Sequence, residues 1–239
     1  MDQARSFGTV ADRYDRYRPS YAAEAVRWAL GERPVRVADV GAGTGILSRL
    51  LRAEGHDVVA VEPDNQMRAR LSSVSPGITA LAGTAEDIPL PDGAVDAVVA
   101  GQAYHWFDAE RAHPEIARVL RPAGVFAAFW NDADLSAPWT LQFAEIIDGS
   151  HAALGRPRLE LGDEFGPVTG AEFRHDMWLT PDDLVGMAMT RSPYLVGTPE
   201  QQRDLVHAVR RLIAADPDLA GRERFAMPHL TRVQRAVRA

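Results

Sequence analysis

RVADVGAGTGIL, residues 36–47, begins as an apolar run, breaks into three alternating glycines and resumes as an apolar, helix-like stretch. This order is typical of a buried strand, a tight turn and a helix. Glycines at such a turn let the backbone approach a ligand closely, and the N–H groups that begin the helix point toward it. The stretch therefore predicts a nucleotide-binding loop between the first strand of a sheet and the next helix.

The spacing of the glycines discriminates between nucleotides. The dinucleotide fingerprint places glycines at positions 1, 3 and 6. Gly41 and Gly43 fit positions 1 and 3, but position 6 is Ile46 and the third glycine is Gly45. No Gly-Lys-Ser/Thr follows, so the loop is not a P-loop either. A nicotinamide-dependent oxidoreductase stays an alternative, and the misplaced glycine counts against it.

Two carboxylates narrow the ligand further. Asp39 lies two residues before Gly41, where its charge would repel a pyrophosphate and attract an ammonium or sulfonium group. Glu62 ends the predicted second strand, 21 residues after Gly41, where an acidic side chain can accept the hydroxyls of a ribose. The predicted ligand has a ribose and positive charge but no phosphate, and S-adenosylmethionine fits that description.

Short β-rich runs alternate with helical patterns from about residue 35 to 130, which indicates a parallel, doubly wound α/β sheet covered on both faces. The expected strands are 35–40, 56–63, 78–83, 94–101 and 125–130, and the expected helices are 46–55, 64–73 and a stretch that ends at 124. After residue 131 the pattern changes. We expect a helix within 132–155, a strand at 173–180, two helices opened by Pro181 and Pro199, and a last strand within 224–239. This region predicts a C-terminal helical elaboration.

Four motifs in this order resemble the class I S-adenosylmethionine-dependent methyltransferases, and within them the small-molecule group commonly labelled type 11. The motifs are DVGAGTG (39–45), AVEPDNQM (60–67), GTAEDIPLPDGAVDAVV (83–99) and RVLRPAGVFAAFW (118–130). The resemblance covers about residues 35–131. It implies a Rossmann-like, mostly parallel seven-stranded sheet, S-adenosylmethionine as cofactor and S-adenosylhomocysteine as product. It also implies methyl transfer by in-line displacement to an oxygen, nitrogen or carbon of a small-molecule acceptor.

The resemblance also implies a division of labour along the chain. Residues 1–239 form a single methyltransferase domain, with an N-terminal lid or arm at 1–34. The cofactor-binding core is 35–131, and residues 132–239 supply substrate-side helices and the last strands.

The resemblance assigns cofactor contacts residue by residue. The loop from Gly41 to Gly45 resembles the backbone cradle, Asp39 the acidic residue near the methionine amino group, and Glu62 the ribose ligand. Gln102 corresponds to the position beside the sulfonium. The full set of expected cofactor-binding residues is Tyr14, Arg18, Asp39, Gly41, Ala42, Gly43, Gly45, Glu62, Pro63, Asp64, Met67, Ala85, Glu86 and Gln102.

Several of these residues keep an ordinary alternative. Asp64 and Met67 match a ribose-side polar contact and an adenine-packing side chain, yet a helical methionine can simply fill a core. Ala85 and Glu86 match the adenine-recognition segment, with Asp87 able to share that role, yet the two acids could only cap a turn. Tyr14 and Arg18 match a lid over the methionine end of the cofactor, with Arg18 pairing its carboxylate; the alternative is an amphipathic helix packed on the domain.

GQAYHWFDAE, residues 101–110, leaves the predicted fourth strand at its carboxyl end, the rim where α/β sheets bind ligands. His105 could take a proton from the acceptor as the methyl arrives. In the alternative, His105 only orients the loop, and Trp106 and Phe107 anchor it in the core. Methyl transfer often needs no base, because positioning the nucleophile in line supplies most of the acceleration.

Composition excludes other classes of function. The chain has no cysteine, which excludes disulfide scaffolds, thiolate zinc sites and cysteine nucleophiles and favours a cytoplasmic location. Its net charge of −7, without a basic stripe, argues against nucleic-acid partners. The seven histidines are scattered, so no metal site is expected, and no apolar run is long enough to predict a membrane span. A non-catalytic protein that keeps the fold is the remaining alternative.

Overall fold

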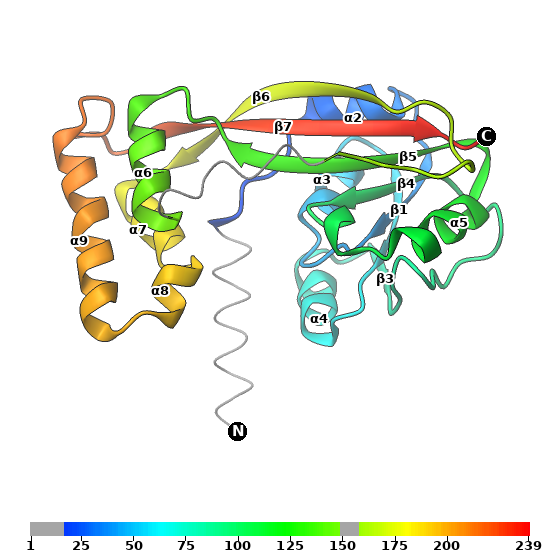
Figure 1. Ribbon diagram of the computed structural model, residues 1–239, viewed down its shortest axis with the longest axis horizontal. Helices are drawn as coiled ribbons and strands as arrows, with labels where there is room; N and C mark the ends of the chain where they lie inside the picture. Colours follow the sequence, from blue (N-terminus) through cyan, green and yellow to red (C-terminus); the bar gives the residue numbers. More distant parts are fainter. Residues whose placement is uncertain (1–16, 149–157) are drawn as a thin grey trace. The chain divides into compact units, whose positions relative to one another are not determined.

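The chain folds around a seven-stranded α/β sheet in the computed structural model (Figure 1). The structure describes residues 17–148 and 158–239. The strand order is β3-β2-β1-β4-β5-β7-β6, and the pairs among β1 to β5 are parallel. Figure 1 shows β7 running opposite to its neighbours β5 and β6. The predicted Rossmann-like, mostly parallel sheet is confirmed.

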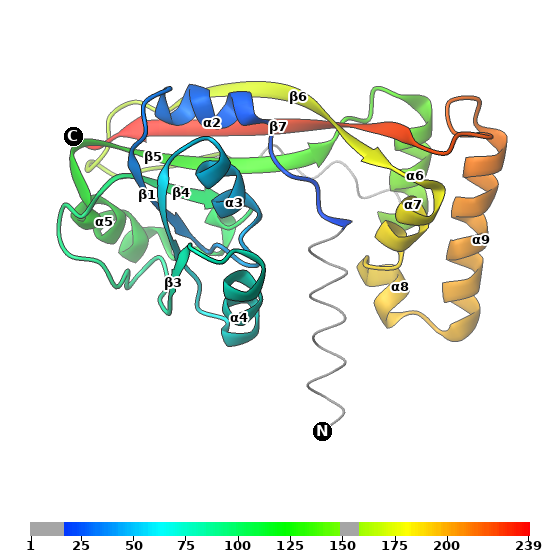
Figure 2. The ribbon, with the colours of Figure 1, turned by 180° about the vertical axis from the view of Figure 1, so that it is seen from behind.

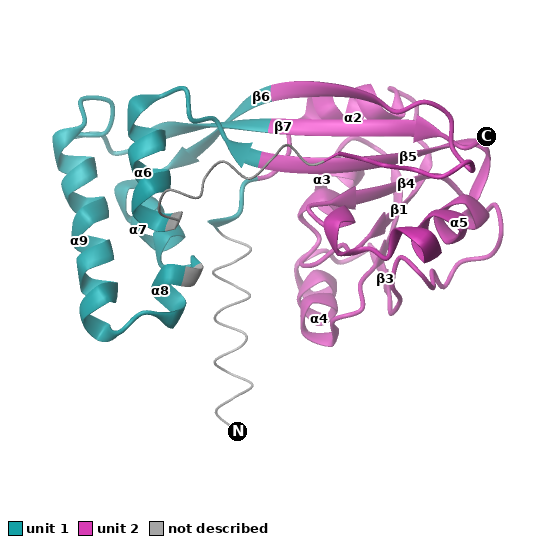
Figure 3. Ribbon diagram, viewed as in Figure 1, with its two compact units in different colours: residues 1–19, 132–156, 174–230 teal, residues 20–131, 157–173, 231–239 magenta. Residues whose placement is uncertain are grey.

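The chain divides into two compact units (Figure 3). One unit comprises residues 20–131, 157–173 and 231–239, and we call it the sheet unit. The other comprises residues 1–19, 132–156 and 174–230, and we call it the helical unit. Along the chain, the division after Asn131 coincides with the end of the predicted cofactor-binding core.

The sheet unit holds the glycine loop. Its strands are β1 (Arg36–Val40), β2 (Asp57–Val61), β3 (Thr79–Leu81) and β4 (Val95–Gly101), together with the first part of β5 (Leu120–Ala133). Its helices are α2 (Ala23–Leu30), α3 (Ile46–Ala53), α4 (Asn65–Val74) and α5 (Ala109–Val119), with the short 3₁₀ helix η1 (Tyr104–Trp106). After the first residue, β1 and β2 are buried throughout, as expected for parallel strands covered on both faces.

Two apolar cores lie on the two faces of this sheet. Figure 1 shows α5 in front of the strands, and Figure 2, from behind, shows α2 and α3 in front. Alternate residues of β1 point to opposite faces, so Val37 and Asp39 face α3 while Ala38 and Val40 face α5. The α5 core includes Ala38, Val40, Ala112, Ile116 and Phe126; the α2/α3 core includes Val26, Val37, Leu47, Leu51 and Val99.

The helical unit contains α6 (Pro138–Asp148), α7 (Pro181–Ala188), α8 (Ser192–Val196) and α9 (Pro199–Ala215). The helices predicted to open at Pro181 and Pro199 are confirmed. Each is preceded by a threonine, Thr180 or Thr198, whose side chain accepts a backbone hydrogen bond in a capping box. The strands β6 (Thr169–Leu179) and β7 (Phe225–Val237) run through both units.

Strand β5 begins earlier than the sequence predicts. The helical pattern was expected to continue to residue 124, but α5 ends at Val119 and Leu120 already has extended backbone, with φ −73° and ψ 142°. The turn that follows contains Ala123 at φ 60°, and the pairing of β4 with β5 shifts register there. Local turn chemistry at Pro122 and Ala123 therefore overrides the helical periodicity.

Candidate functional site

The glycine loop joins the carboxyl end of β1 to α3. The register pairs Val40 with Val61, so the ends of β1 and β2 lie side by side. The N–H groups of Gly41 and Ala42 both donate to the Val61 carbonyl, at 2.9 and 3.1 Å. These two hydrogen bonds hold the loop against the end of β2, directly before Glu62.

All three glycines have left-handed backbone, with φ of 71° at Gly41, 57° at Gly43 and 85° at Gly45. A Cβ at Gly41 would lie 2.7 Å from Ala103 Cβ, and a Cβ at Gly45 would lie 2.8 Å from Leu71 Cγ. These two glycines permit close packing within the protein. A Cβ at Gly43 would meet only the sulfur of Met67, at 3.9 Å. The Gly43 side of the loop therefore has room for a ligand.

Glu62 links this loop to the start of α4. Its side chain is buried; Oε2 accepts from Gly43 N and Oε1 from Asp64 N, each at 2.8 Å. A carboxylate oxygen has two lone pairs, so each can still accept a hydroxyl. The arrangement fixes a carboxylate with spare acceptor capacity beside the open edge of the loop, and it fits a diol such as that of ribose.

Asp39 lies beneath the loop with no exposed surface. Its Oδ2 accepts from Ser48 Oγ of α3 at 2.5 Å, whereas Oδ1 has no hydrogen-bond partner among the described residues. Burial raises the pKa of Asp39 to about 7; the Ser48 hydrogen bond opposes this rise and the negative charge of Glu62 adds to it. An unpartnered buried oxygen suits a cationic ligand above the loop, but direct contact of Asp39 with an ammonium group stays a prediction.

The start of α4 carries the next predicted residues. Asp64 is the N-cap, and its Oδ1 accepts from Gln66 N at 2.9 Å and Met67 N at 2.8 Å. Pro63 is exposed, and so is Met67, at 40%. Met67 therefore does not fill a core, and its sulfur is the atom nearest the open side of Gly43. Packing of Met67 against an adenine stays a prediction.

Glu86 braces a neighbouring segment of the same rim. Its Oε1 accepts from Asp108 N at the start of α5, at 2.9 Å. Burial alone would raise the pKa of Glu86, but hydrogen bonds from Asp108, Thr84 and its own backbone, with the charge of Arg111, hold it below its usual value. Ala85 is buried and Asp87 is exposed. Glu86 thus binds the backbone at the start of α5. Recognition of adenine by Ala85 and Glu86 stays a prediction.

Gln102 and His105 follow the carboxyl end of β4. Gln102 has a positive φ of 54°, and its Nε2 donates to the Asn131 carbonyl at 2.8 Å. His105 is exposed, and its ring centroid lies 5.0 Å from that of Trp106, which is 81% exposed. In the alternative in which Trp106 and Phe107 anchor the loop in the core, the Trp106 part is therefore wrong, whereas Phe107 does pack against the core. His105 faces solvent beside an exposed indole, and its role as a base stays a prediction.

Sequence reasoning missed the residue that anchors this loop, Tyr104. Its ring lies about 6 Å from those of Phe107, His113 and Phe126. Its hydroxyl donates to the Glu160 carbonyl at 2.6 Å. Tyr104 and Phe107 pack against the α5 core, so the side chains between them, His105 and Trp106, are turned outward. The local sequence YHWF contains four rings and does not reveal which pair points inward.

The N-terminal arm contributes less to the described structure. Tyr14 lies outside the described residues. Arg18 is partly buried and belongs to the helical unit, whereas the glycine loop belongs to the sheet unit. The predicted covering of the cofactor by Tyr14 and Arg18 stays a prediction.

Comparisons with known proteins identify the family. The methyltransferase-domain family matches residues 38–128, from β1 through most of β5. Uncharacterized methyltransferases of Mycobacterium tuberculosis and Mycobacterium bovis are each 42% identical over 239 residues, spanning 100% of this chain and 98% of theirs. The chain belongs to the class I S-adenosylmethionine-dependent methyltransferases. A solved structure from Anaeromyxobacter dehalogenans, assigned as a type II methyltransferase, is 25% identical, with a TM-score of 0.60 over 92% of this methyltransferase and 97% of that chain.

The family assignment decides between the alternatives that the sequence left open. This methyltransferase is an enzyme whose cofactor is S-adenosylmethionine, and the nicotinamide alternative is wrong. Within residues 17–148 and 158–239, no cluster of three or more His, Asp or Glu side chains could hold a metal ion. No helix in that same part of the chain is long and apolar enough to cross a membrane.

Proposed function

We propose that this methyltransferase transfers the methyl group of S-adenosylmethionine to an oxygen, nitrogen or carbon atom of a small-molecule acceptor. One observation carries the proposal: the Glu62 carboxylate accepts a hydrogen bond from Gly43 N at the side of the glycine loop that has room for a ligand. The proposal treats residues 1–239 as one functional domain, with the acceptor held by residues from 132 onward.

The residues around the loop divide the contacts with the cofactor among them. Glu62 accepts the ribose hydroxyls with the lone pairs that Gly43 N and Asp64 N leave free. The N–H groups that begin α3 face the methionine carboxylate, where the partial positive charge of the helix N-terminus favours an anion. When ionised, Asp39 adds negative charge beneath the loop, which stabilises a cation above it. Met67 covers the adenine.

When bound, S-adenosylmethionine supplies an activated methyl: the acceptor's lone pair forms the new bond to carbon while the carbon–sulfur electron pair returns to sulfur, leaving S-adenosylhomocysteine. The chain's main contribution is then to orient the acceptor in line and to exclude water. His105 takes the proton that an acceptor hydroxyl or amine loses, and its exposed ring on the rim after β4 supports that role.

The direct test is incorporation of radiolabelled methyl from S-adenosylmethionine into a panel of phenols, carboxylic acids and amines by the full-length enzyme. Labelling of at least one compound above a no-enzyme control supports the proposal. Labelling only of added nucleic acid or protein would contradict the small-molecule assignment.

With a labelled acceptor in hand, His105→Ala should lower turnover by roughly 10²-fold, the scale of general-base catalysis. The affinity for S-adenosylhomocysteine should stay unchanged, because His105 is not among the residues assigned to the cofactor. Unchanged turnover with an unchanged pH profile would exclude His105 as the base.

A further inference from the structure

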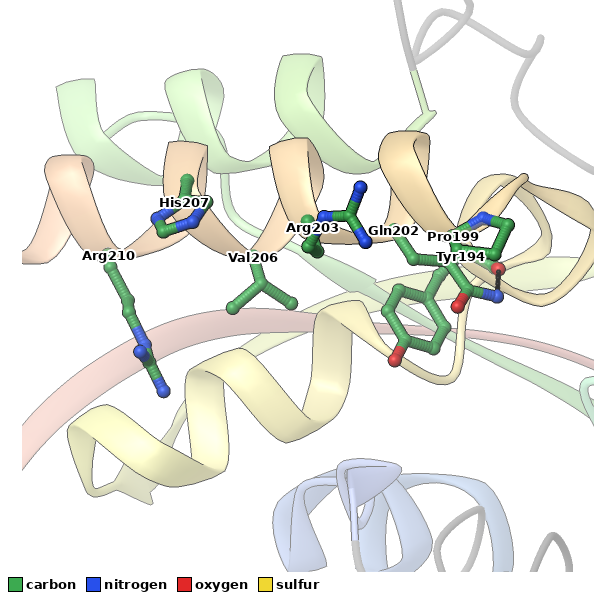
Figure 4. Close-up of a pocket in the computed structure, with 7 residues that line it drawn as sticks. All are labelled: Tyr194, Pro199, Gln202, Arg203, Val206, His207 and Arg210. Carbon is green, nitrogen blue, oxygen red and sulfur yellow. Dashed lines mark hydrogen bonds between the residues drawn. The ribbon is translucent and has the colours of Figure 1, made fainter.

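A groove runs along the surface of the helical unit between α8 and α9, far along the sequence from the glycine loop. Its volume is about 450 Å³, within the range of pockets that hold small molecules. Figure 4 shows the lining side chains in a row along α9, with Tyr194 at one end and Arg210 at the other. We call this surface the α9 groove.

Two arginines and a histidine are among the polar side chains that line the α9 groove. Arg203, His207 and Arg210 are spaced four and three residues apart, so they share one face of α9. Seven residues of helix place Arg203 and Arg210 about 10 Å apart along the axis. None of the three side chains makes a hydrogen bond or ion pair within the part of the chain that the structure describes. The two guanidinium groups leave positive charge along the groove without a counter-charge, which favours an anion there.

No acidic side chain lines the α9 groove. The helix has two acids, Glu200 and Asp204, and neither lines the groove. A second groove in the helical unit, of about 370 Å³, differs in this respect because Asp176 and Asp218 line it together with arginines. Unbalanced positive charge therefore distinguishes the α9 groove, in a chain whose net charge is −7.

Local hydrogen bonds hold the α9 groove in shape. Gln202 Nε2 donates to the Tyr194 carbonyl at 2.9 Å and ties α8 to α9. The capping box of Thr198 and Gln201 fixes the first turn of α9. Tyr194 and Val206 are both half-buried and supply an apolar wall beside the cations. Apolar walls with a few placed polar groups are the usual composition of a small-molecule site.

We propose that the α9 groove binds a small molecule that carries an oxyanion, a phosphate ester or a carboxylate, on an apolar or aromatic body. Arg203 and Arg210 donate to the oxyanion through their guanidinium groups, and His207 offers a further ring N–H between them. The apolar body packs on Tyr194 and Val206. The proposal is independent of methyl transfer, because it involves none of the residues assigned to the cofactor.

The test is ligand-observed saturation-transfer NMR on the full-length protein in low-salt, phosphate-free buffer, with phenyl phosphate and benzoate as probes. Both probes report through their phenyl protons, so one experiment compares the two oxyanions. We expect saturable binding of at least one probe, with a Kd on the order of 1 mM for a ligand of this size. A lower Kd for phenyl phosphate assigns the groove to phosphate esters, and a lower Kd for benzoate assigns it to carboxylates.

Substitutions locate the binding. Arg203→Gln and Arg210→Gln should each raise the Kd about 10-fold, the scale of a lost hydrogen bond to a charged group. Arg211→Gln is the matched control, because it removes the same charge from the next residue of α9, which does not line the groove, and the Kd should change less than about twofold. S-adenosylhomocysteine affinity, measured on the same samples, should be unchanged and reports that each variant is folded.

Three results would overturn the proposal. One is the absence of saturable binding of either probe up to about 20 mM, well above the expected Kd. Another is an equal loss of binding in Arg211→Gln and Arg203→Gln, which would show that the probes respond to the net charge of the helix and not to the groove. The third is binding of heparin without binding of either probe, which would assign the surface to a polyanionic macromolecule.

Discussion

Asparagine at position 39 should remove a pH dependence that Asp39 imposes on folding. Burial raises the pKa of Asp39 from its ordinary value of 3.8 to about 7. The native state therefore holds this proton more tightly than the unfolded chain, so stability is unaffected below about pH 4 and falls as the pH rises toward 7. The difference between the two pKa values corresponds to roughly 4 kcal/mol of unfolding free energy. Asparagine keeps the shape and an acceptor for Ser48 but cannot ionise.

Urea denaturation of the cofactor-free protein between about pH 4 and pH 8 measures this effect. The unfolding free energy of the wild type should fall by roughly 4 kcal/mol relative to that of Asp39→Asn over this range. Asp163→Asn is the control, because the Asp163 side chain is exposed and makes no hydrogen bond or ion pair with another described residue; its curve should parallel that of the wild type. If the Asp39→Asn curve also parallels the wild type within about 1 kcal/mol, the buried carboxyl does not titrate as the structure indicates.

Two further predictions concern the loops around the site. Gly45→Ala should lower the unfolding free energy by about 2–4 kcal/mol, because its Cβ would lie 2.8 Å from Leu71 at a left-handed φ of 85°. Gly43→Ala, where the added Cβ meets open space, should lower it by only about 1 kcal/mol. Equal losses of stability in thermal denaturation of the two variants would contradict the assigned packing. Tyr104→Ala should destabilise the protein by about 3 kcal/mol and Trp106→Ala by less than about 0.5 kcal/mol, because Tyr104 packs in an aromatic cluster and Trp106 is 81% exposed. The reverse order would show that Trp106 anchors the loop.

The sheet could be predicted from the sequence because its signals are local and agree with one another. Continuous apolar runs at 36–40 and 57–61 and the glycines between them specify a parallel strand, a turn and a helix. Proline and threonine at 180–181 and 198–199 mark two helix starts for the same reason. The end of α5 has a local signal in Pro122, whereas the register of β5 could not be predicted, because it depends on the partner strand β4.

The positions of the candidate residues in the fold could be predicted from the sequence, but their contacts could not. Spacing placed Asp39 and Glu62 at the ends of adjacent strands, where the structure has them. Strand parity alone turns Asp39 toward α3, but its hydrogen bond to Ser48 depends on how α3 docks on the sheet. In YHWF, the choice of Tyr104 over Trp106 as anchor depends on His113, Phe126 and the Glu160 carbonyl, which are distant in sequence.

The central claim is that the glycine loop and Glu62 form the S-adenosylmethionine site of this methyltransferase. Isothermal titration of S-adenosylhomocysteine into wild type and Glu62→Gln tests it most directly. We expect binding to the wild type and a 10- to 100-fold weaker affinity, approximately, in Glu62→Gln, the scale of a lost hydrogen bond to a charged group. Equal affinity in the two proteins, or no binding to the wild type, would contradict the assignment.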